Sequence, residues 1–444
     1  MQHLKQLSIT FKGYESTSEN SINVFNYHES LLKDLQPHPN LRAFSLIRFQ
    51  SVDFPRWGRE LTNSLPNLVK LYIVSCYGLQ ILPSLSKLRY LKVLKLLDLA
   101  NLEYVEDSTS NSDHTAFSVS GSRIAELTFF PSLENLEIRE VPNLKGWWRV
   151  ANQLNDIDSS NSSHACQSSF SCLSLLAIEN CPNLLSFPLC PSVQELCLTR
   201  LNEALQIKMG QDDIELVSSS TCVSKLQSDI GTHPNLRHVT LDNTDYFKSI
   251  PVERLTSMTI RLALRLQSLS EIGEVFKRCS SLRNLGIDLC VNLKSLSGGL
   301  EYLTALESLK IHAASRAFSC KENDDGSPWR SVSQTLRSLE LSGLRSLDSL
   351  PKGLQYLTSL RHLKIDGCMP LNEVPEWISC FSSLQSLSLS GCTNLISLPT
   401  AMRQLTSLQR LEIMRCSELL SRRCRNPIGE DWSKIQHIPS ISIS

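Results

Sequence analysis

The chain repeats one short phrase along its whole length, and this repetition constrains the fold more than any other feature. Residues 382–406, SSLQSLSLSGCTNLISLPTAMRQLT, follow the pattern LxxLxLxxCxxLxxLP, and similar phrases stand 24 residues before and after them. Aligned on the first leucine of the pattern, about fifteen copies begin at Leu4, Leu41, Leu68, Leu91, Leu133, Leu173, Val193, Leu236, Leu255, Leu282, Leu306, Leu336, Leu360, Leu384 and Leu408. The chain is therefore built from one structural unit that is used many times.

Each copy predicts a short strand followed by a returning segment. Leu387 and Leu389 face one side of such a strand and Ser388 and Ser390 the other, because successive side chains alternate. One strand cannot bury its inner side alone, but stacked copies share a continuous core. Steps of 23 or 24 residues fall in the ~20–29 range of leucine-rich repeats. The predicted fold class is an α/β repeat solenoid, a leucine-rich-repeat horseshoe with a parallel β-sheet on its concave face and mostly irregular or short helical convex segments.

The domain organisation follows from the same phrase. A chain of 444 residues exceeds the ~250–300 at which one globular core stops growing, whereas a solenoid has no such limit. Because the phrasing is the same throughout, we predict one domain, 1–444, with a C-terminal cap at about 417–444. Stretches rich in Ser, Asp, Asn and Gly interrupt the repeats at about 103–130, 149–170, 202–232 and 315–333. We expect long, partly disordered loops there, either passive or in contact with a partner.

Composition narrows the possible environments and partners. The chain has 44 basic and 44 acidic residues, so no net field attracts nucleic acid or a membrane surface. No apolar run approaches the ~18 residues of a membrane-spanning helix, and the first residues lack the apolar core of a signal peptide. Fifteen cysteines without a CxxC pair argue against a disulfide framework or a zinc site. We expect a cytoplasmic protein, with the nucleus as the alternative, that has no membrane span and does not bind nucleic acid.

Motifs that carry chemistry are missing from the sequence. There is no GxxxxGK[ST] phosphate loop, no HExxH and no GxSxG. Six repeats place a cysteine at the turn after the strand, namely Cys76, Cys181, Cys290, Cys368, Cys392 and Cys416. A thiol there is small and weakly polar, so we expect it to be buried near backbone groups rather than reactive or metal-bound. The sequence predicts no enzyme, no cofactor and no metal site in these residues.

Three phrases add a family resemblance to this repeat pattern. They are LPNLVKLYIVSCYGLQILPSLSKLRYLKVLKLLDLANLEYVED at 65–107, FFPSLENLEIREVPNLKGWWR at 129–149, and the ending CSELLSRRCRNPIGEDWSKIQHIPSISI at 416–443. Together they resemble the repeat region of plant intracellular disease-resistance proteins of the coiled-coil, nucleotide-binding, leucine-rich-repeat class. The ending is more specific than the leucine pattern.

The resemblance implies domains that these residues do not contain. The family carries a coiled coil and a nucleotide-binding switch ahead of its repeats, whereas Met1 falls inside a repeat phrase with no polar cap before it. We therefore expect an N-terminally truncated portion of a receptor, from an expression fragment, a truncated gene or a degenerate gene copy. ATP or ADP binding would follow only from a nucleotide-binding domain upstream.

Two functional hypotheses of different classes remain open. The resemblance implies a ligand-recognition and autoinhibitory repeat domain that binds a pathogen effector or a modified, guarded host protein in the defence response. Its intramolecular partner would be the nucleotide-binding domain. The alternatives are a substrate-selecting repeat adaptor of an F-box ubiquitin ligase, whose F-box would precede the repeats, and a non-functional receptor fragment.

The repeat register also predicts which side chains face the partner. Outward positions on the last strands, and the residues flanking them, carry charges of both signs that suit protein recognition. The candidate protein-binding residues on the concave face are Lys310, His312, Glu340, Arg361, His362, Lys364, Asp366, Arg410, Glu412 and Arg415.

Overall fold

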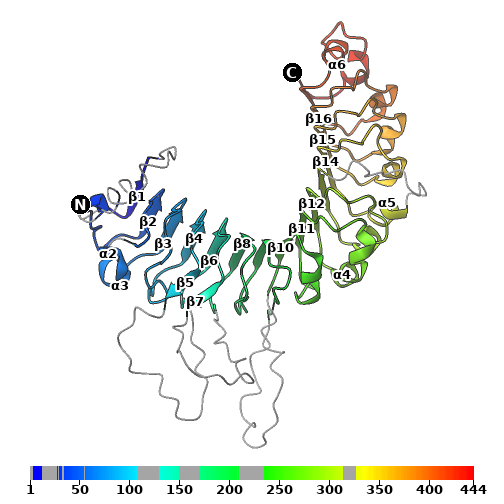
Figure 1. The fold of residues 1–444 in the computed structure, drawn as a ribbon. Coiled ribbons are helices and arrows are strands. Elements are labelled where there is room, and N and C mark those ends of the chain that lie inside the picture. The colour runs from blue at the N-terminus through cyan, green and yellow to red at the C-terminus, as the bar shows by residue number, and fades with distance from the viewer. Residues whose placement is uncertain are drawn as a thin grey trace, which may run out of the picture. The chain divides into compact units, whose positions relative to one another are not determined.

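The computed structural model describes residues 4–12, 28, 30–32, 35–54, 56–107, 130–149, 170–207, 209, 235–313 and 327–444. The chain divides into two compact units (Figure 1). Unit 1 comprises Met1–Leu236 and Ser249–Pro251, and unit 2 comprises Arg237–Lys248 and Val252–Ser444. Each unit is built on a parallel sheet whose strands follow one another in chain order.

Unit 1 carries seven strands of this parallel sheet among its described residues. They are β1 (Gln6–Thr10), β2 (Ala43–Ile47), β3 (Lys70–Val74), β4 (Val93–Leu97), β6 (Asn135–Arg139), β8 (Leu175–Cys181) and β9 (Glu195–Leu201). Two short helices, α2 (Arg56–Arg59) and α3 (Leu61–Ser64), lie in the returning segment after β2. A second sheet pairs β5 (Tyr104–Asp107) with β7 (Gly146–Arg149) in parallel.

Unit 2 carries nine parallel strands in the part of it that the structure describes. They are β10 (His238–Leu241), β11 (Ser257–Arg261), β12 (Asn284–Asp288), β13 (Ser308–His312), β14 (Ser338–Ser342), β15 (His362–Asp366), β16 (Ser386–Ser390), β17 (Arg410–Met414) and β18 (Ser440–Ile443). The returning segments form single turns of helix, which are η3 (Thr244–Lys248), η4 (Leu269–Ile272), α4 (Gly273–Arg278), η5 (Leu300–Tyr302), α5 (Ser327–Ser331), η6 (Lys352–Tyr356), η7 (Glu376–Cys380) and η8 (Thr400–Gln404). The predicted leucine-rich-repeat fold class is confirmed.

The core is made by the leucines that the repeat register predicts. Every one of the fifteen aligned positions lies two residues before a strand, from Leu4 before β1 to Leu408 before β17. Strands pair in register, so Leu363, Leu387, Leu411 and Ile441 stack in one column. Leu387 and Leu389 are 1% and 0% exposed, whereas Ser388 between them is only partly buried. The inward and outward assignment is therefore confirmed.

Many of the strands are followed by a turn with left-handed backbone. The first residue after the strand often has a positive φ, and in three adjacent units it is glycine: Gly343, Gly367 and Gly391. Cysteine follows next in several units and donates its thiol hydrogen to backbone carbonyls; the Sγ of Cys290, for example, lies 3.4 Å from the oxygen of Ile260. Burial raises the pKa of the Cys290 thiol to about 11. Five of the six turn cysteines are buried, as predicted, whereas Cys416 is only partly buried. A hydrogen bond with Cys392 lowers the pKa of the Cys416 thiol to about 7.

The expected insertion at 103–130 begins later than predicted. Residues 104–107 form β5, and Glu106 on this strand is only 2% exposed. Its carboxylate accepts hydrogen bonds from the backbone N–H groups of Leu85 and Ser86 and from the hydroxyls of Ser84 and Ser86. The acidic sequence EYVED looked like a loop, but one of its carboxylates caps a neighbouring turn. Similarly, the end of the expected loop at 315–333 forms α5. The remainder of the four interruptions falls largely outside the described residues.

The C-terminal cap at 417–444 is built around one buried carboxylate. It contains α6 (Glu418–Arg423), α7 (Trp432–Ile435) and β18, which pairs with β17. Asp431 is 0% exposed and accepts hydrogen bonds from the N–H of Leu398 at 2.9 Å and from two nitrogens of Arg423, and Lys434 lies 2.8 Å away. Burial alone would raise the pKa of Asp431, but these partners outweigh it and hold the pKa below its ordinary value of 3.8. The motif GEDWSKIQHIP therefore fastens the cap to the preceding repeat.

Candidate protein-binding surface

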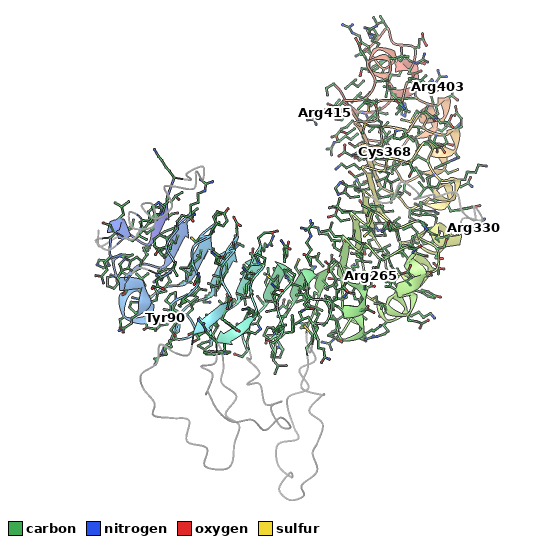
Figure 2. All side chains as sticks on the ribbon, in the orientation of Figure 1. Tyr90, Arg265, Arg330, Cys368, Arg403 and Arg415 are labelled. Atoms are coloured by element: carbon green, nitrogen blue, oxygen red, sulfur yellow. The ribbon has the colours of Figure 1, made fainter. Side chains whose placement is uncertain are left out.

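The open face of unit 2 is the surface formed by the outward side chains of its strands. Because strands β13 to β17 pair in register, side chains at equivalent positions form rows that cross the strands. The centre row consists of the middle outward residue of each strand: Lys310, Glu340, Lys364, Ser388 and Glu412. Figure 2 shows the side chains of this unit, with Arg415 on the side of the strands and Arg403 on the side of the helical turns.

The centre row contains a cluster of ion pairs. Nζ of Lys364 lies 2.7 Å from Oε1 of Glu340, and Nζ of Lys310 lies 3.5 Å from Oε2 of the same carboxylate. Partial burial opposes ionisation of Glu340, but the hydrogen bond and charge of Lys364, helped by Lys310, hold the pKa of Glu340 below its ordinary value. The hydrogen bond to Glu340 in turn raises the pKa of Lys364. These three predicted residues are thus brought together, and the one carboxylate offsets one of the two positive charges.

A second ion-pair cluster lies nearer the carboxyl ends of the strands. Oδ1 of Asp288 lies 2.7 Å from Nδ1 of His312, and Oδ2 of Asp288 lies 2.8 Å from Nε of Arg261. His312 was predicted from its strand position, whereas Asp288 and Arg261 were not. Both residues occupy the position on β11 and β12 that His312 occupies on β13, so the same repeat alignment extended to these two strands would have identified them.

The other predicted residues are not engaged in such clusters. Arg361, His362 and Arg410 are exposed, and within the described part of the chain their side chains make no hydrogen bond or ion pair. Asp366 and Glu412 are partly buried and likewise unpaired among those residues. Arg415 follows β17 with a φ of 52°, and its backbone N–H donates to the oxygen of Ser444. The predicted set therefore divides into residues paired in these two clusters and unpaired charges around them.

Unit 1 has a charge cluster of its own that the sequence reading did not single out. Glu137 on β6 lies 2.6 Å from Nζ of Lys95 and 3.5 Å from Nη2 of Arg139, and Arg139 also reaches Glu179 at 3.3 Å. Nε of Arg139 is buried without a hydrogen-bond partner among the described residues. The cluster links the open faces of β4, β6 and β8.

Two further features of the described residues concern metal-ligand clusters and membrane-spanning helices. None of their His, Cys, Asp and Glu side chains gather in threes in a way that could hold a metal ion. Among the same residues, no helix combines the length and apolar character needed to cross a membrane.

Repeated parallel strands with a charged open face define a leucine-rich-repeat protein, a class whose members generally act through protein–protein contacts rather than catalysis. Residues 1–99 match the family model described as R13L1/DRL21 LRRs, and residues 260–417 match the one described as plant disease resistance protein RPS2-like, leucine-rich repeats. Putative disease resistance protein RGA4 of Solanum bulbocastanum is 30% identical over 167 residues, which are 37% of this chain and 14% of that protein. The repeats of this chain are thus similar to those of plant disease-resistance proteins, and the match spans only a small part of that relative.

Solved structures with related folds are more distant. The leucine-rich repeat domain of the type III effector XopL is 21% identical, with a TM-score of 0.32, over 45% of this chain and 71% of that one. An LRR protein of Leptospira interrogans is 15% identical, with a TM-score of 0.32, over 93% of this chain and 98% of that one.

Proposed function

We propose that this chain is the ligand-recognition repeat region of a plant immune receptor and that the open face of unit 2 binds a protein ligand. The ligand would be a pathogen effector or a host protein that the receptor guards. One observation carries the proposal: strands β13 to β17 hold outward charges of both signs in fixed register on a well-packed core. Such a preordered surface loses little conformational entropy on binding, and its mixed charges favour specific protein contacts.

The receptor context supplies the remaining parts of the proposal. The disease-resistance relative is much longer than its match to this chain, so we assign nucleotide binding to a domain outside these residues. Repeats of unit 1 would contact that domain and restrain it until a ligand binds to unit 2. This arrangement places the receptor in the cytoplasm, or in the nucleus if its ligand acts there.

The test is a charge reversal in a receptor that carries this repeat region behind a nucleotide-binding domain. Lys364→Glu together with Arg410→Glu should alter ligand-triggered cell death in plant tissue, because both side chains lie on the open face. Lys352→Glu with Arg403→Glu is the matched control, since both residues are exposed on the helical turns η6 and η8. If the open-face variant signals normally while variants within 108–129 do not, recognition belongs to that interruption and the proposal is wrong.

A further inference from the structure

The strand starts of unit 2, taken together, carry an excess of positive charge. In unit 2, the residue before a strand and its first residue include Arg237, Arg283, Arg337, Arg361 and Arg410, but only one acidic residue, Glu307. The whole chain, by contrast, has 44 basic and 44 acidic residues. Glu307 is already bound by Arg283, whose Nη1 lies 2.8 Å from its carboxylate. The basic excess at the strand starts is therefore not balanced locally.

From β14 to β17 the strand starts carry positive charge on β14, β15 and β17 and none on β16, and we call this part the strand-start rim. It consists of Arg337, Ser338, Arg361, His362, Gln385, Ser386, Gln409 and Arg410. Ser338, His362, Ser386 and Arg410 are direct partners on successive strands. The three arginines and the histidine are exposed and have no hydrogen-bond or ion-pair partner within the part of the chain that the structure describes. No carboxylate lies within this rim.

The strand-start rim differs in this respect from the centre row beside it. A ligand carboxylate that approaches Lys364 must compete with Glu340, which already holds that ammonium group at 2.7 Å. A carboxylate that approaches Arg361 or Arg410 replaces only water. Arginine also offers two parallel N–H groups to a carboxylate, a geometry that lysine cannot provide. The rim is thus the part of the open face best suited to a negatively charged ligand.

We propose that the strand-start rim of β14 to β17 binds an acidic, extended segment of the partner protein. This inference rests on the proposed function and names the chemistry of its ligand. Three strand intervals of about 4.8 Å give the rim a length of about 14 Å, which four or five extended residues cover at about 3.3 Å each. Two or three carboxylates at alternate residues of such a segment would face the same side and reach the arginines together.

Nucleic acid fits the same surface less well. Single-stranded nucleic acid binds through basic grooves combined with aromatic side chains on which bases stack. The outward positions of β13 to β17 carry no Phe, Tyr or Trp. Behind the rim lie the carboxylates of Glu340, Asp366 and Glu412, which would repel a continuous phosphate backbone. A peptide can place its charges to avoid these carboxylates, whereas a phosphate chain cannot.

The experiment measures binding of labelled peptides to the full 444-residue chain by fluorescence polarisation. The probes are a peptide of about ten residues that alternates Glu and Ser, the same peptide with Gln for Glu, and an oligothymidylate of similar length. The rim variant is Arg361→Glu with Arg410→Glu. The matched control is Lys352→Glu with Arg403→Glu, which changes the net charge equally but on the helical turns η6 and η8. Figure 2 shows Arg403 on the side of the helical turns.

We expect the Glu peptide to bind more tightly than the Gln peptide and to weaken as salt rises, because exposed charges are screened. The rim variant should lose about tenfold or more in affinity, while the control should change by less than about twofold. Equal losses in rim variant and control would show that net charge alone attracts the peptide and would overturn the proposal. Tighter binding of oligothymidylate would overturn it in favour of nucleic acid.

The two proposals can fail separately. If the Glu peptide does not bind the rim but the open-face variant still alters ligand-triggered cell death, the proposed function stands and the acidic-segment inference is wrong. If the peptide binds the rim but the open-face charge reversals leave signalling unchanged, the rim binds acidic segments but is not the recognition surface of a receptor. Circular dichroism of all variants establishes that each remains folded.

Discussion

Asp431 offers the sharpest test of how the C-terminal cap is held. Its carboxylate is fully buried and contacts three donors from separate parts of the chain: the N–H of Leu398, the guanidinium of Arg423 and the ammonium of Lys434. Asp431→Asn keeps the size and shape of the side chain while removing its charge. The new amide would keep one acceptor oxygen, but its NH₂ group would point at groups that can only donate.

The expected cost can be estimated from these contacts. Removing one partner of a buried ion pair typically costs about 3–5 kcal/mol, because the other partner is left desolvated. Here the side chains of Arg423 and Lys434 retain 28% and 15% exposure, so both cations can regain some hydration. The N–H of Leu398 is buried and cannot. We therefore expect a loss at the lower end of that range, about 3 kcal/mol.

The loss should be confined to one end of unit 2. In a repeat array each unit is stabilised mainly by its neighbours, so a weakened cap frays the adjacent strands first. Amide hydrogen exchange in α6, α7, β18 and β17 should accelerate, while exchange in β11 to β13 should not change. Urea unfolding followed by circular dichroism gives the accompanying change in stability.

Arg422→Ala provides the control for this substitution. The Arg422–Glu418 pair lies on the same cap, but its side chains are 71% and 80% exposed, so its loss should change stability by less than about 0.5 kcal/mol. If Asp431→Asn is as mild as this control, or if exchange accelerates equally in all strands, the carboxylate does not fasten the cap and the reasoning is refuted.

Further predictions concern the core, the turns and acid stability. Leu387→Ala should cost about 2–5 kcal/mol because the side chain is 1% exposed, and Ser388→Ala at most about 0.5 kcal/mol; equal shifts in urea unfolding would contradict the facing of the strand. Gly391→Ala should destabilise more than Gly367→Ala in the same assay, since both have φ near +60° but only the new Cβ at Gly391 would lie 3.2 Å from a backbone Cα. Because the pKa of Asp431 is lowered by folding, its contribution to stability should be complete above pH 3.8 and be lost as pH falls through the lower, folded-state pKa. Asp431→Asn should therefore weaken the fall in unfolding free energy as pH decreases through the acid range. An unchanged fall would show that Asp431 does not contribute in this way.

The sequence predicted the strands, because their side chains alternate between the two faces with a period of two residues. Leucines at alternate positions located fifteen strands, because a shift of one residue would have turned every leucine outward. It did not predict β18, whose phrase SISI is short and lacks the preceding leucine of the repeat. Nor did it predict β5, where Glu106 is buried by contacts with residues some twenty positions earlier. Such contacts depend on the stacking of neighbouring units, which no local pattern encodes.

For the candidate surface, the sequence predicted which side chains face outward but not which of them form ion pairs. The register placed Lys310, Glu340 and Lys364 outward on consecutive strands, and the structure shows that both lysines pair with the carboxylate of Glu340. Whether an arginine at the strand start finds a partner depends on side-chain reach and on the neighbouring repeat, so Arg283 is paired and Arg361 is not. The distinction between the centre row and the strand-start rim therefore depends on side-chain pairing, which the repeat pattern does not encode.

The cap and the strand-start rim are connected through β17. This strand carries Arg410 on the rim and pairs on its far side with β18, whose position depends on the cap that Asp431 holds. Fraying of the cap would therefore displace Arg410 before it affects Arg361, which lies two strands further from the end. If the rim binds as a whole, Asp431→Asn should weaken the Glu peptide even though the residue lies away from the open face, and it should do so by about as much as Arg410→Ala alone. A variant that frays β17 yet binds the peptide with full affinity would place the binding determinants on β14 and β15 only.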